Sequence, residues 1–504
     1  MKKFYITTPL YYVNDEPHIG HAYTTILADV ISRIQKMQNN EVFFLTGTDE
    51  HGQKVEEAAK KNNVSPKKHV DQYVKRFKKV WKEIDIDYTD FIRTTDTRHI
   101  DVVIKILNIL FEKEEIYKSE YEGLYSVSEE RFITEKEAEE GNFREIKTLK
   151  EKNYFFKMSK YQDKLINHIN NNPDFIQPES RKNEILGFLK KPLADLCISR
   201  PKERLQWGIE LPFDNNYVTY VWFDALINYI SAIGWNENNE KFKECWPANY
   251  HLMAKDILTT HCVYWPTMLM ACNIALPKTI FAHGWWLMDD IKMSKSIGNV
   301  IKPLDLAYKY GSDSLRYYLM SNMVLGQDAS FTLDSFIRKY NSDLANDYGN
   351  LVNRVLIMIN KNFDGKIPEK YDYDKTDMEL IIKAKEMPNQ ILNYYNNLKI
   401  HKAVELIMQL LRSVNKYLEV KAPWKLIKSN DDDDIFKAST TLYIAAELLK
   451  IGTILLHPIM PDKTQKLLQS LNVDIKKDLL FGTLNSNTKI STANNLFPRI
   501  EKEG

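Results

Sequence analysis

The chain has 504 residues, of which 44% are hydrophobic and 27% are charged. At roughly 150 residues per domain, this length predicts about three domains, each large enough to bury a core of its own. The 69 Lys+Arg and 68 Asp+Glu give a formal net charge of +1. Bulk charge therefore does not favour nucleic-acid binding, and an RNA partner would need a local surface.

Cysteine usage and hydropathy indicate a cytoplasmic protein without a membrane span. The cysteines form no Cys-x-x-Cys pair and predict reduced thiols: Cys197, Cys245, Cys262 and Cys272. No stretch of about 18 uncharged apolar residues occurs, and the most apolar late segment, residues 445–460, contains two charges and a proline. The β-branched and aromatic residues from Phe4 to Thr8 stop at Pro9, which predicts a strand rather than a signal peptide.

Residues 1–60 alternate between strand and helix patterns. We expect a strand at Phe4–Thr7, a loop that holds Pro9 and Pro17, a helix from about His21 to Met37, and a second strand at Glu41–Leu45. Apolar residues recur every three or four positions in the helix, which predicts one stripe facing a sheet. Strand, helix and strand of this length are typical of a βαβ unit with a parallel sheet.

From about residue 116 to 210 the chain has short segments with dense charge and frequent glycine and proline, which predicts an inserted domain. The first fold then resumes, with strand-like runs at Tyr217–Phe223 and Thr279–His283 and a helix near Ser312–Ser321. Beyond about residue 340 the pattern is helix after helix. We interpret the acidic run Asp431–Asp434 as a solvated loop.

The first segment with chemical meaning is His18-Ile19-Gly20-His21, which opens the first helix. Two imidazoles three residues apart in a first helical turn point the same way, and Gly20 permits close approach of a ligand. The helix N-terminus adds N–H groups and partial positive charge, so the segment suits a polyphosphate. Taken alone, it is more often a pair of ordinary histidines near a helix cap.

The second segment, Lys292-Met293-Ser294-Lys295-Ser296, follows about 270 residues later. Two ammonium groups and two hydroxyls on a glycine-flanked loop suit a mobile clamp on phosphates. A Lys/Ser pentapeptide alone is usually a solvated loop, but its presence with the first segment favours the phosphate interpretation.

Together the two segments resemble the signatures of class I aminoacyl-tRNA synthetases, and the whole chain resembles the methionyl-tRNA synthetases. The shared segments are Pro9-Leu10-Tyr11-Tyr12, Thr48-Asp49-Glu50-His51-Gly52, Val221-Trp222-Phe223-Asp224-Ala225, Lys255-Asp256 with His261, and His283-Gly284-Trp285. The resemblance implies an α/β fold: a doubly wound, Rossmann-like catalytic domain with a parallel sheet, a connective insert, and an all-α helical bundle that binds the anticodon. The implied boundaries are 1–115 and 211–340 for the two catalytic halves, 116–210 for the insert and 341–504 for the bundle.

The resemblance also implies a methionine-tRNA ligase. Methionine carboxylate attacks the α-phosphate of ATP, bound with Mg²⁺, to give methionyl-adenylate and pyrophosphate; methionine is then transferred to the terminal ribose of methionine tRNA, initiator tRNA included. The carboxylate is already ionised, so catalysis should rest on positioning and charge neutralisation. The implied catalytic residues are His18, His21, Lys292 and Lys295. The implied ATP contacts are Gly20, His283, Gly284, Ser294 and Lys295.

Methionine offers only a flexible thioether, so its pocket should have aromatic and apolar walls. By resemblance these walls are Leu10, Tyr12, Trp222, Ala225, Tyr229 and His261, and Asp49 binds the substrate ammonium group. Without the family, Trp222 and Tyr229 are more simply core aromatics. Arg200 and Asp256 match positions near the active site of the family.

Anticodon reading is expected in the terminal helices. Asn350 and Arg354 lie four residues apart on one helix face, and Pro423-Trp424 stands where the helix pattern breaks. An amide, a guanidinium and an indole suit splayed bases. These positions match residues with which methionyl-tRNA synthetases read the CAU anticodon. From spacing alone, a core tryptophan and a surface arginine are the simpler interpretation.

One departure from the family concerns zinc. Relatives often carry cysteine pairs in the insert, whereas residues 1–196 contain no cysteine, and Ser126 and Ser128 are poor zinc ligands. We therefore expect an insert without structural zinc. The chain also ends without the appended dimerisation domain of many relatives, which favours a monomer.

The alternatives are an adenylyltransferase that uses the first motif, a relative without activity, and other class I synthetases. A small-molecule adenylyltransferase has no need of the terminal helices, and a catalytically dead RNA-binding relative would not need the charged residues that both motifs keep. Leucine, isoleucine and valine enzymes have larger editing inserts, and the cysteine enzyme requires a substrate-binding zinc.

Overall fold

The computed structural model describes residues 2–13, 16–126, 131–133, 138, 146–288, 291–292, 301–429, 431–474, 479–492 and 495–501. The chain forms two compact units. The first contains residues 1–17, 39–80 and 87–283, and the second contains residues 18–38, 81–86 and 284–504. The four-part division expected above stays a prediction.

The first unit combines parallel and antiparallel sheets with short helices. Its elements are β1 (Phe4–Tyr12), β2 (Val42–Asp49), α2 (Gln53–Lys61), α3 (Pro66–Glu83, whose last turn belongs to the second unit), β3 (Asp90–Arg93), α4 (Thr97–Glu112), β4 (Ile116–Ser126), β5 (Arg131–Ile133), β6 (Ile146–Phe156), η1 (Met158–Tyr161), α6 (Gln162–Asn171), β7 (Ile176–Gln177), α7 (Glu179–Phe188), β8 (Leu196–Cys197), β9 (Ser199–Pro201), β10 (Glu210–Leu211), β11 (Asp214–Thr219), α8 (Val221–Leu226), α9 (Asn228–Ser231), α10 (Asn239–Cys245), β12 (Tyr250–Ala254), η2 (Lys255–Ile257), η3 (Thr260–Tyr264), α11 (Trp265–Ala271) and β13 (Ile280–His283).

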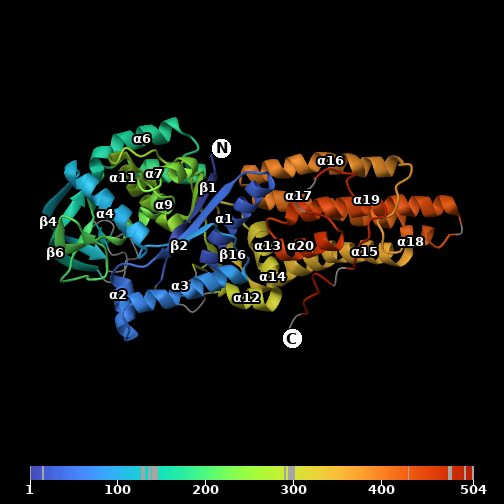
Figure 1. Ribbon diagram of the computed structural model, residues 1–504, viewed down its shortest axis with the longest axis horizontal. Coiled ribbons are helices and arrows are strands. Elements are labelled where there is room, and N and C mark those ends of the chain that lie inside the picture. Colours follow the sequence, from blue (N-terminus) through green and yellow to red (C-terminus); the bar gives the residue numbers. More distant parts are fainter. Residues whose placement is uncertain are drawn as a thin grey trace. The chain divides into compact units, whose positions relative to one another are not determined.

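The second unit is mainly helical. Its elements are α1 (Ile19–Met37), β14 (Trp286–Met288), β15 (Ile291–Lys292), α12 (Pro303–Tyr310), α13 (Ser312–Asn322), β16 (Ala329–Phe331), α14 (Leu333–Lys339), the π-helical segment η5 (Tyr340–Gly349), α15 (Asn350–Asn362), α16 (Lys375–Asn396), α17 (Ile400–Lys421), α18 (Pro423–Leu426), α19 (Asp432–Leu456) and α20 (Pro461–Ser470). Figure 1 shows α16, α17 and α19 as long helices that run side by side.

The predicted parallel sheet is confirmed. Its six strands have the order β3-β2-β1-β12-β13-β7, and every neighbouring pair is parallel. From β1 the chain adds β2 and β3 on one side, and later adds β12 and β13 on the other. The order therefore reverses between β1 and β12, and open parallel sheets bind ligands beyond the strand ends at such a reversal.

The first strand is longer than predicted. It runs through Pro9 to Tyr12, so the expected loop around Pro9 is wrong. The pairing of β1 with β2 shifts its register between Thr7 and Leu10. Because proline lacks the N–H that a regular ladder requires, an irregularity of this kind lets the strand continue past it. The side-chain hydroxyl of Thr8 donates to the carbonyl of Pro9 at 2.9 Å within this irregularity.

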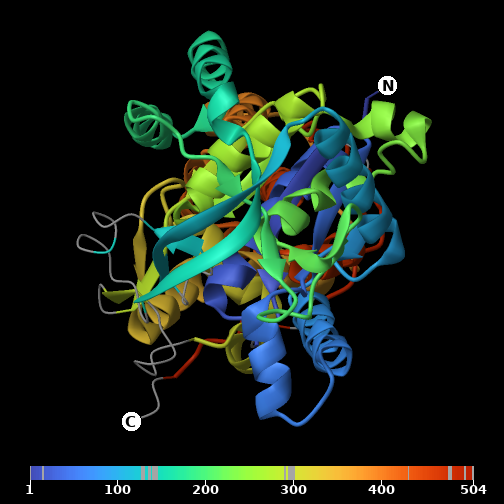
Figure 2. The same cartoon turned by 90° about the vertical axis from the view of Figure 1, so that its left-hand side faces the viewer.

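Antiparallel strands follow in the predicted insert. Strands β4 and β6 pair from Ile116 opposite Phe156 to Ser126 opposite Ile146, and Figure 2 shows them as a long twisted ribbon. Within the range expected for the insert, β7 nevertheless pairs with β13 at the edge of the parallel sheet. Part of residues 116–210 thus contributes to the main sheet.

Two sequence expectations are wrong at element ends. The run Tyr217–Phe223 is strand only to Thr219, and α8 begins at Val221. Both parts are largely buried, so hydrophobicity alone could not separate strand from helix. The acidic run Asp431–Asp434 is the start of α19 rather than a loop: the side chain of Asp431 accepts from the backbone N–H of Asp433, and the following aspartates lie in the positive first turn.

Helix α19 is the core of the bundle. It is the one helix in the described part of the chain long and apolar enough to cross a membrane, and the apolar stretch that qualifies it is entirely buried. Its fully buried pair Lys450 and Glu447 lies 2.7 Å apart. Glu447 also accepts from the backbone N–H of Leu484 at 2.5 Å, and Lys450 donates to the carbonyl of Leu480 at 3.1 Å. The burial of α19 against its own chain accounts for its apolar composition.

A single guanidinium connects several elements of the second unit. Arg316 on α13 is fully buried and donates to Asp29 on α1 at 2.6 Å. Its other contacts are with four backbone carbonyls: Ile84, Asp85, Pro458 and Ile459. Asp29 also accepts from Arg33 at 2.7 Å. These bonds engage every N–H that a guanidinium can offer.

Asp313, at the start of α13, is a buried carboxyl. Its Oδ2 accepts from the backbone N–H of Lys463 at 2.6 Å, and its Oδ1 has no hydrogen-bond partner among the described residues. Burial raises the pKa of Asp313 to about 7. The unfolded value is near 3.9. Between these values the folded chain holds a proton that the unfolded chain releases, so this contribution to stability is present below about pH 4 and lost as pH rises through about 7.

Replacement of Asp313 by Asn should therefore stabilise the protein at pH 8 relative to the wild type, with a smaller gain or a small loss at pH 5, because Asn carries no charge to bury. Urea unfolding at the two pH values measures this difference. Asp433→Asn, an exposed aspartate paired with Lys437 at 2.5 Å, is the control and should show no such pH dependence. An Asp313→Asn effect that is equal at both pH values would contradict the prediction.

Candidate functional site

Several predicted site residues of the first unit lie at the carboxyl ends of parallel strands. Leu10 and Tyr12 end β1, Asp49 ends β2, and His283 ends β13. Tyr12 and Asp49 are partners in the β1–β2 register, and Asp49 is buried. The Tyr12 hydroxyl donates to the carbonyl of His51 at 3.0 Å, which fixes the ring beside the end of β2.

Tyr229 and His261 form a buried pair. The Tyr229 hydroxyl and His261 Nε2 are 2.8 Å apart, and His261 Nδ1 lies 3.0 Å from the carbonyl of Ile257. Because a carbonyl only accepts, Nδ1 carries the proton and Nε2 accepts from the tyrosine. Burial lowers the pKa of His261 to about 4. The pair is thus uncharged at neutral pH.

An aromatic cluster fixes Tyr229 from its other sides. His251 stacks on it with ring centroids 4.2 Å apart, and Trp265 lies at 5.8 Å. The indole of Trp265 donates to His251 Nε2 at 3.3 Å, so His251 Nδ1 donates to Thr7 at 2.8 Å. Burial lowers the pKa of His251 well below its usual value. Leu10, Tyr12 and Trp222 are half-buried against the same core, and Ala225 is buried in it.

A buried carboxylate that the sequence analysis did not single out holds two imidazoles. Asp224 is fully buried, with Oδ2 2.6 Å from His51 Nδ1 and Oδ1 2.7 Å from His99 Nε2. His99 Nδ1 lies 2.9 Å from the Ser231 hydroxyl. Burial alone would raise the pKa of Asp224, but attraction by His51 and hydrogen bonds from both imidazoles lower it. Asp224 and His51 lie in two of the segments that resemble the family, and this position was the only sign in the sequence that they matter. Nothing in the sequence indicated a role for His99.

A second buried carboxylate lies next to Asp49 in the chain. Glu50 is fully buried and accepts from Arg93 through both oxygens, at 2.7 and 2.9 Å. Thr48 and Thr95 donate to the same carboxylate at 2.7 and 2.6 Å. Bidentate pairs of this kind are strong and directional, so they fix the backbone that carries Asp49.

The two residues expected near the active site have different environments. Arg200 on β9 is buried, donates to the carbonyl of Ser199 at 2.7 Å and lies 4.5 Å from the ring centroid of Tyr220. Asp256 lies in the short helix η2 that follows β12, and its side chain is exposed.

In the second unit, His18 and His21 begin α1 as predicted. His18 Nδ1 accepts from the backbone N–H of Gly20 at 3.1 Å, and His21 Nδ1 accepts from that of His18 at 3.3 Å. The rings stack with centroids 3.7 Å apart. Both protons must therefore lie on Nε2 when the rings are neutral. Burial, together with the neighbouring His18, lowers the pKa of His21 well below its usual value. A Cβ on Gly20 would lie 2.9 Å from the His18 ring, so a larger residue would disturb this arrangement.

Gly284 is required by close packing. A Cβ at this position would lie 2.0 Å from the carbonyl oxygen of Gln327. Lys292 ends β15, where its backbone pairs with Leu287. The predicted residues Ser294 and Lys295 lie outside the described part of the chain.

The structure brings together the three predicted anticodon residues. Asn350, Arg354 and Trp424 line one groove of about 750 Å³. The Arg354 guanidinium lies 5.7 Å from the Trp424 ring centroid and 3.7 Å from the Glu419 carboxylate. Trp424 is 36% exposed, and α17 ends at Lys421 so that α18 can begin at Pro423. An indole face, a guanidinium and amides on one accessible surface can stack on and bond unpaired bases.

Comparisons with known proteins cover almost the whole chain. The family described as tRNA synthetases class I (M) matches residues 4–142 and 142–356, and the anticodon binding domain of methionyl tRNA ligase matches residues 367–504. The methionine--tRNA ligase of Caldanaerobacter subterraneus subsp. tengcongensis is 44% identical over 511 residues, which span 100% of this chain and 80% of that protein. The Clostridium tetani protein of that name is 46% identical over 511 residues, spanning 100% of this chain and 79% of its own length.

A solved structure is also similar to this chain over almost its whole length. Mycobacterium tuberculosis methionyl-tRNA synthetase in complex with methionyl-adenylate has a TM-score of 0.95 and 37% sequence identity, covering 99% of this chain and 100% of that one.

Replacement of Asp224 by Asn should lower the free energy of unfolding by about 3 kcal/mol, because an amide can accept from only one of the two imidazoles that the buried carboxylate holds. Urea unfolding measures this loss. Glu210→Gln is the control: Glu210 pairs with Lys202 at 2.5 Å but is exposed, so the loss should stay below about 1 kcal/mol. Equal, small effects of the two replacements would show that Asp224 does not hold the imidazoles in place.

Proposed function

The chain belongs to the class I methionyl-tRNA synthetases, and from this premise we propose the residues that carry out each step of the reaction. The enzyme activates methionine with ATP to form methionyl-adenylate and pyrophosphate. It then transfers methionine to the 3′-terminal ribose of its tRNA. The substrate ATP enters as its Mg²⁺ complex, in which the ion neutralises part of the phosphate charge.

His18 and His21 bind the phosphates of ATP. Since both Nδ1 atoms accept from backbone N–H groups, each ring presents an Nε2–H donor without carrying a charge. Neutral donors orient phosphate oxygens, and the positive charge comes from Lys292 and Lys295 as negative charge moves to the leaving pyrophosphate. Gly20, Gly284, Ser294 and His283 also belong to the proposed ATP site. The two glycines leave room for ATP, and Ser294 and His283, the latter at the end of β13, contact it.

The observation that carries the methionine assignment is the uncharged pair Tyr229–His261 within an aromatic wall. A thioether is apolar and polarisable, so a charged imidazole would disfavour it, while neutral rings contact sulfur favourably. Trp222, Ala225, Leu10 and Tyr12 complete the pocket. Asp49 binds the substrate ammonium group, with its backbone fixed by the neighbouring pair of Glu50 and Arg93.

Arg200 and Asp256 act near the reacting groups. Arg200 is held by its neighbours, and a guanidinium suits attraction of the methionine carboxylate or the α-phosphate. Asp256 follows β12, which lies beside the order reversal of the sheet. In the anticodon-binding bundle, Asn350, Arg354 and Trp424 read the CAU anticodon of methionine tRNA, including the initiator.

We further propose a cytoplasmic monomer. The apolar stretch of helix α19 is buried within its own chain, so this stretch offers no surface to a second copy. Sedimentation at micromolar concentration tests this state.

Replacement of Lys295 by Ala should lower methionine-dependent exchange of pyrophosphate into ATP by orders of magnitude while methionine affinity changes little, because its charge is needed chiefly as the phosphoryl group moves. Stopped-flow activation and equilibrium binding separate the two effects. Lys302→Ala, an exposed lysine seven residues later, is the control and should retain full exchange. Loss of methionine affinity with an unchanged activation rate would show that Lys295 has another role.

The insert should contain no structural zinc. Cys197 is the one cysteine in residues 116–210, and burial raises the pKa of its thiol, which disfavours the thiolate that zinc requires. No group of three or more potential metal ligands occurs among the residues that the structure describes. Elemental analysis should find well under one zinc per chain, and a strong chelator should leave Tm unchanged. Stoichiometric zinc would contradict this.

Replacement of Trp424 by Ala should weaken aminoacylation of methionine tRNA by about tenfold to a hundredfold, since stacking contributes roughly 1–3 kcal/mol per base. Pyrophosphate exchange without tRNA should barely change. Tyr371→Ala is the control: this side chain is 40% exposed against 36% for Trp424, lies in the same unit and does not line the groove. If exchange falls together with aminoacylation, or if a tRNA with an altered anticodon is charged equally well by the wild type, the assignment is wrong.

A further inference from the structure

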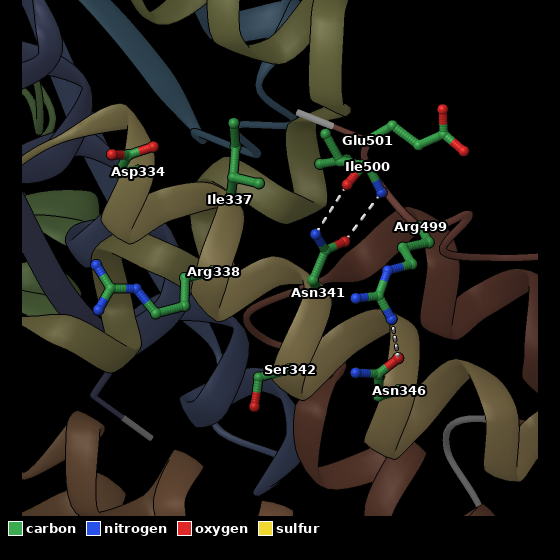
Figure 3. A pocket seen from close by; sticks show the side chains of 9 residues that line it. All are labelled: Asp334, Ile337, Arg338, Asn341, Ser342, Asn346, Arg499, Ile500 and Glu501. Carbon is green, nitrogen blue, oxygen red and sulfur yellow. Dashed lines mark hydrogen bonds between the residues drawn. The ribbon is translucent and has the colours of Figure 1, made fainter. Parts of the chain in front are cut away.

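A second groove adjoins the one that holds the anticodon residues. It has a volume of about 610 Å³ and is lined by parts of α14, η5 and the C-terminal segment. Asn346 lines both grooves. Figure 3 shows this second groove with Arg338, Ser342, Asn346 and Arg499 around it. We name it the Arg338 groove.

The polar residues of the two grooves follow one line along the helices. Arg338, Ser342, Asn346, Asn350 and Arg354 recur at intervals of four residues. Side chains four apart in a helical run occupy neighbouring turns of the same side. The middle of this line is the π-helical segment η5, and its two ends lie on α14 and α15. It carries an arginine at each end and neutral hydrogen-bonding groups between them.

The C-terminal segment is fixed where it borders the groove. The Asn341 side chain both donates to the carbonyl of Ile500 and accepts from its backbone N–H, each at 2.9 Å. The Tyr340 hydroxyl donates to the carbonyl of Pro498 at 2.9 Å. Figure 3 shows the two hydrogen bonds between Asn341 and Ile500 next to Arg499. The Arg499 guanidinium donates to Asn346 at 3.5 Å. The segment therefore presents a second guanidinium to the same groove.

Two arginines and two carboxylates line the Arg338 groove, and the two guanidinium groups are its contact points for an anion. Neither Arg338 nor Arg499 forms an ion pair with a carboxylate among the described residues, and both are exposed. Asp347, which lines the groove of the anticodon residues next to Asn346, is already paired with Arg412 at 2.6 Å. Asp334 and Glu501 also line the Arg338 groove, and Figure 3 shows the Glu501 carboxylate directed away from Arg499.

We propose that the Arg338 groove binds the sugar–phosphate backbone of the tRNA whose anticodon bases bind at Asn350, Arg354 and Trp424. Arginine, serine and asparagine are typical phosphate contacts, and such contacts set register without reading sequence. The continuity of the two grooves through Asn346 places backbone contacts beside base contacts on one RNA strand. This inference rests on the proposed anticodon site.

The test measures tRNA affinity of Arg338→Gln and Arg499→Gln at several salt concentrations, from about 50 to about 200 mM. Each replacement should raise Kd severalfold and reduce the slope of log Kd against log salt by about 0.7–1, because one phosphate contact is lost. The increase should be equal for the natural tRNA and for one with an altered anticodon. Tm of each variant verifies folding. Lys437→Gln, an exposed lysine of α19 paired with Asp433 at 2.5 Å, is the matched control and should leave Kd and slope unchanged.

Three outcomes would overturn the proposal. Unchanged Kd and slope for both arginine variants would exclude phosphate contacts in this groove. A loss confined to the natural tRNA would mean that these arginines read bases. A loss equalled by Lys437→Gln would indicate a general charge effect. Trp424→Ala, measured in parallel, should weaken binding of the natural tRNA more than binding of the tRNA with the altered anticodon, so the anticodon site is tested separately. If Trp424→Ala has this effect while both arginine variants bind normally, only the proposal for the Arg338 groove is refuted.

Discussion

The buried guanidinium of Arg316 is the interaction on which the arrangement of the second unit depends. It is bonded to α1 through Asp29, to the turn after α3 and to the turn before α20. A charge without water is costly unless every donor is used, so these partners must be in place together. Helix α1 carries His18 and His21 at its first turn. The bond from Asp29, in the third turn of α1, to Arg316 fixes the position of this helix in the second unit. The helix that begins with His18 and His21 and the turn before α20 are thus bonded to the same buried guanidinium.

The buried polar groups of the candidate site are of two kinds: imidazoles that are uncharged, and charged groups whose hydrogen-bonding atoms all have partners. Where the proposed ligand is a thioether, His251 and His261 are kept uncharged by burial, and each ring nitrogen has a defined partner. Where charges are buried, as at Asp224 and at Glu50 with Arg93, both carboxylate oxygens are occupied. These networks orient backbone and rings around the pocket without placing an uncompensated charge in it.

Sequence reasoning found local chemistry more easily than long-range contacts. The spacing of His18 and His21 determined their common direction, because both lie within one helical turn. The proximity of Trp424 to Arg354 followed only from the family, since it depends on how three helices pack. His99 could not be found at all: its role exists only because Asp224, more than a hundred residues later, is buried against it. Pro9 misled the prediction because proline usually ends a strand, and here a register shift accommodates it.

The division of the chain into two units separates two kinds of selectivity. The residues proposed to recognise methionine lie in residues 1–17, 39–80 and 87–283, whereas His18, His21 and the anticodon groove belong to the other unit. Most of the residues proposed to contact ATP, and all of those proposed to read the anticodon, belong to the second unit, whose residues are not contiguous in the sequence, whereas His283 belongs to the first. The side chains proposed to select the amino acid and those proposed to read the anticodon therefore lie in different compact units, so a replacement in one set removes no member of the other.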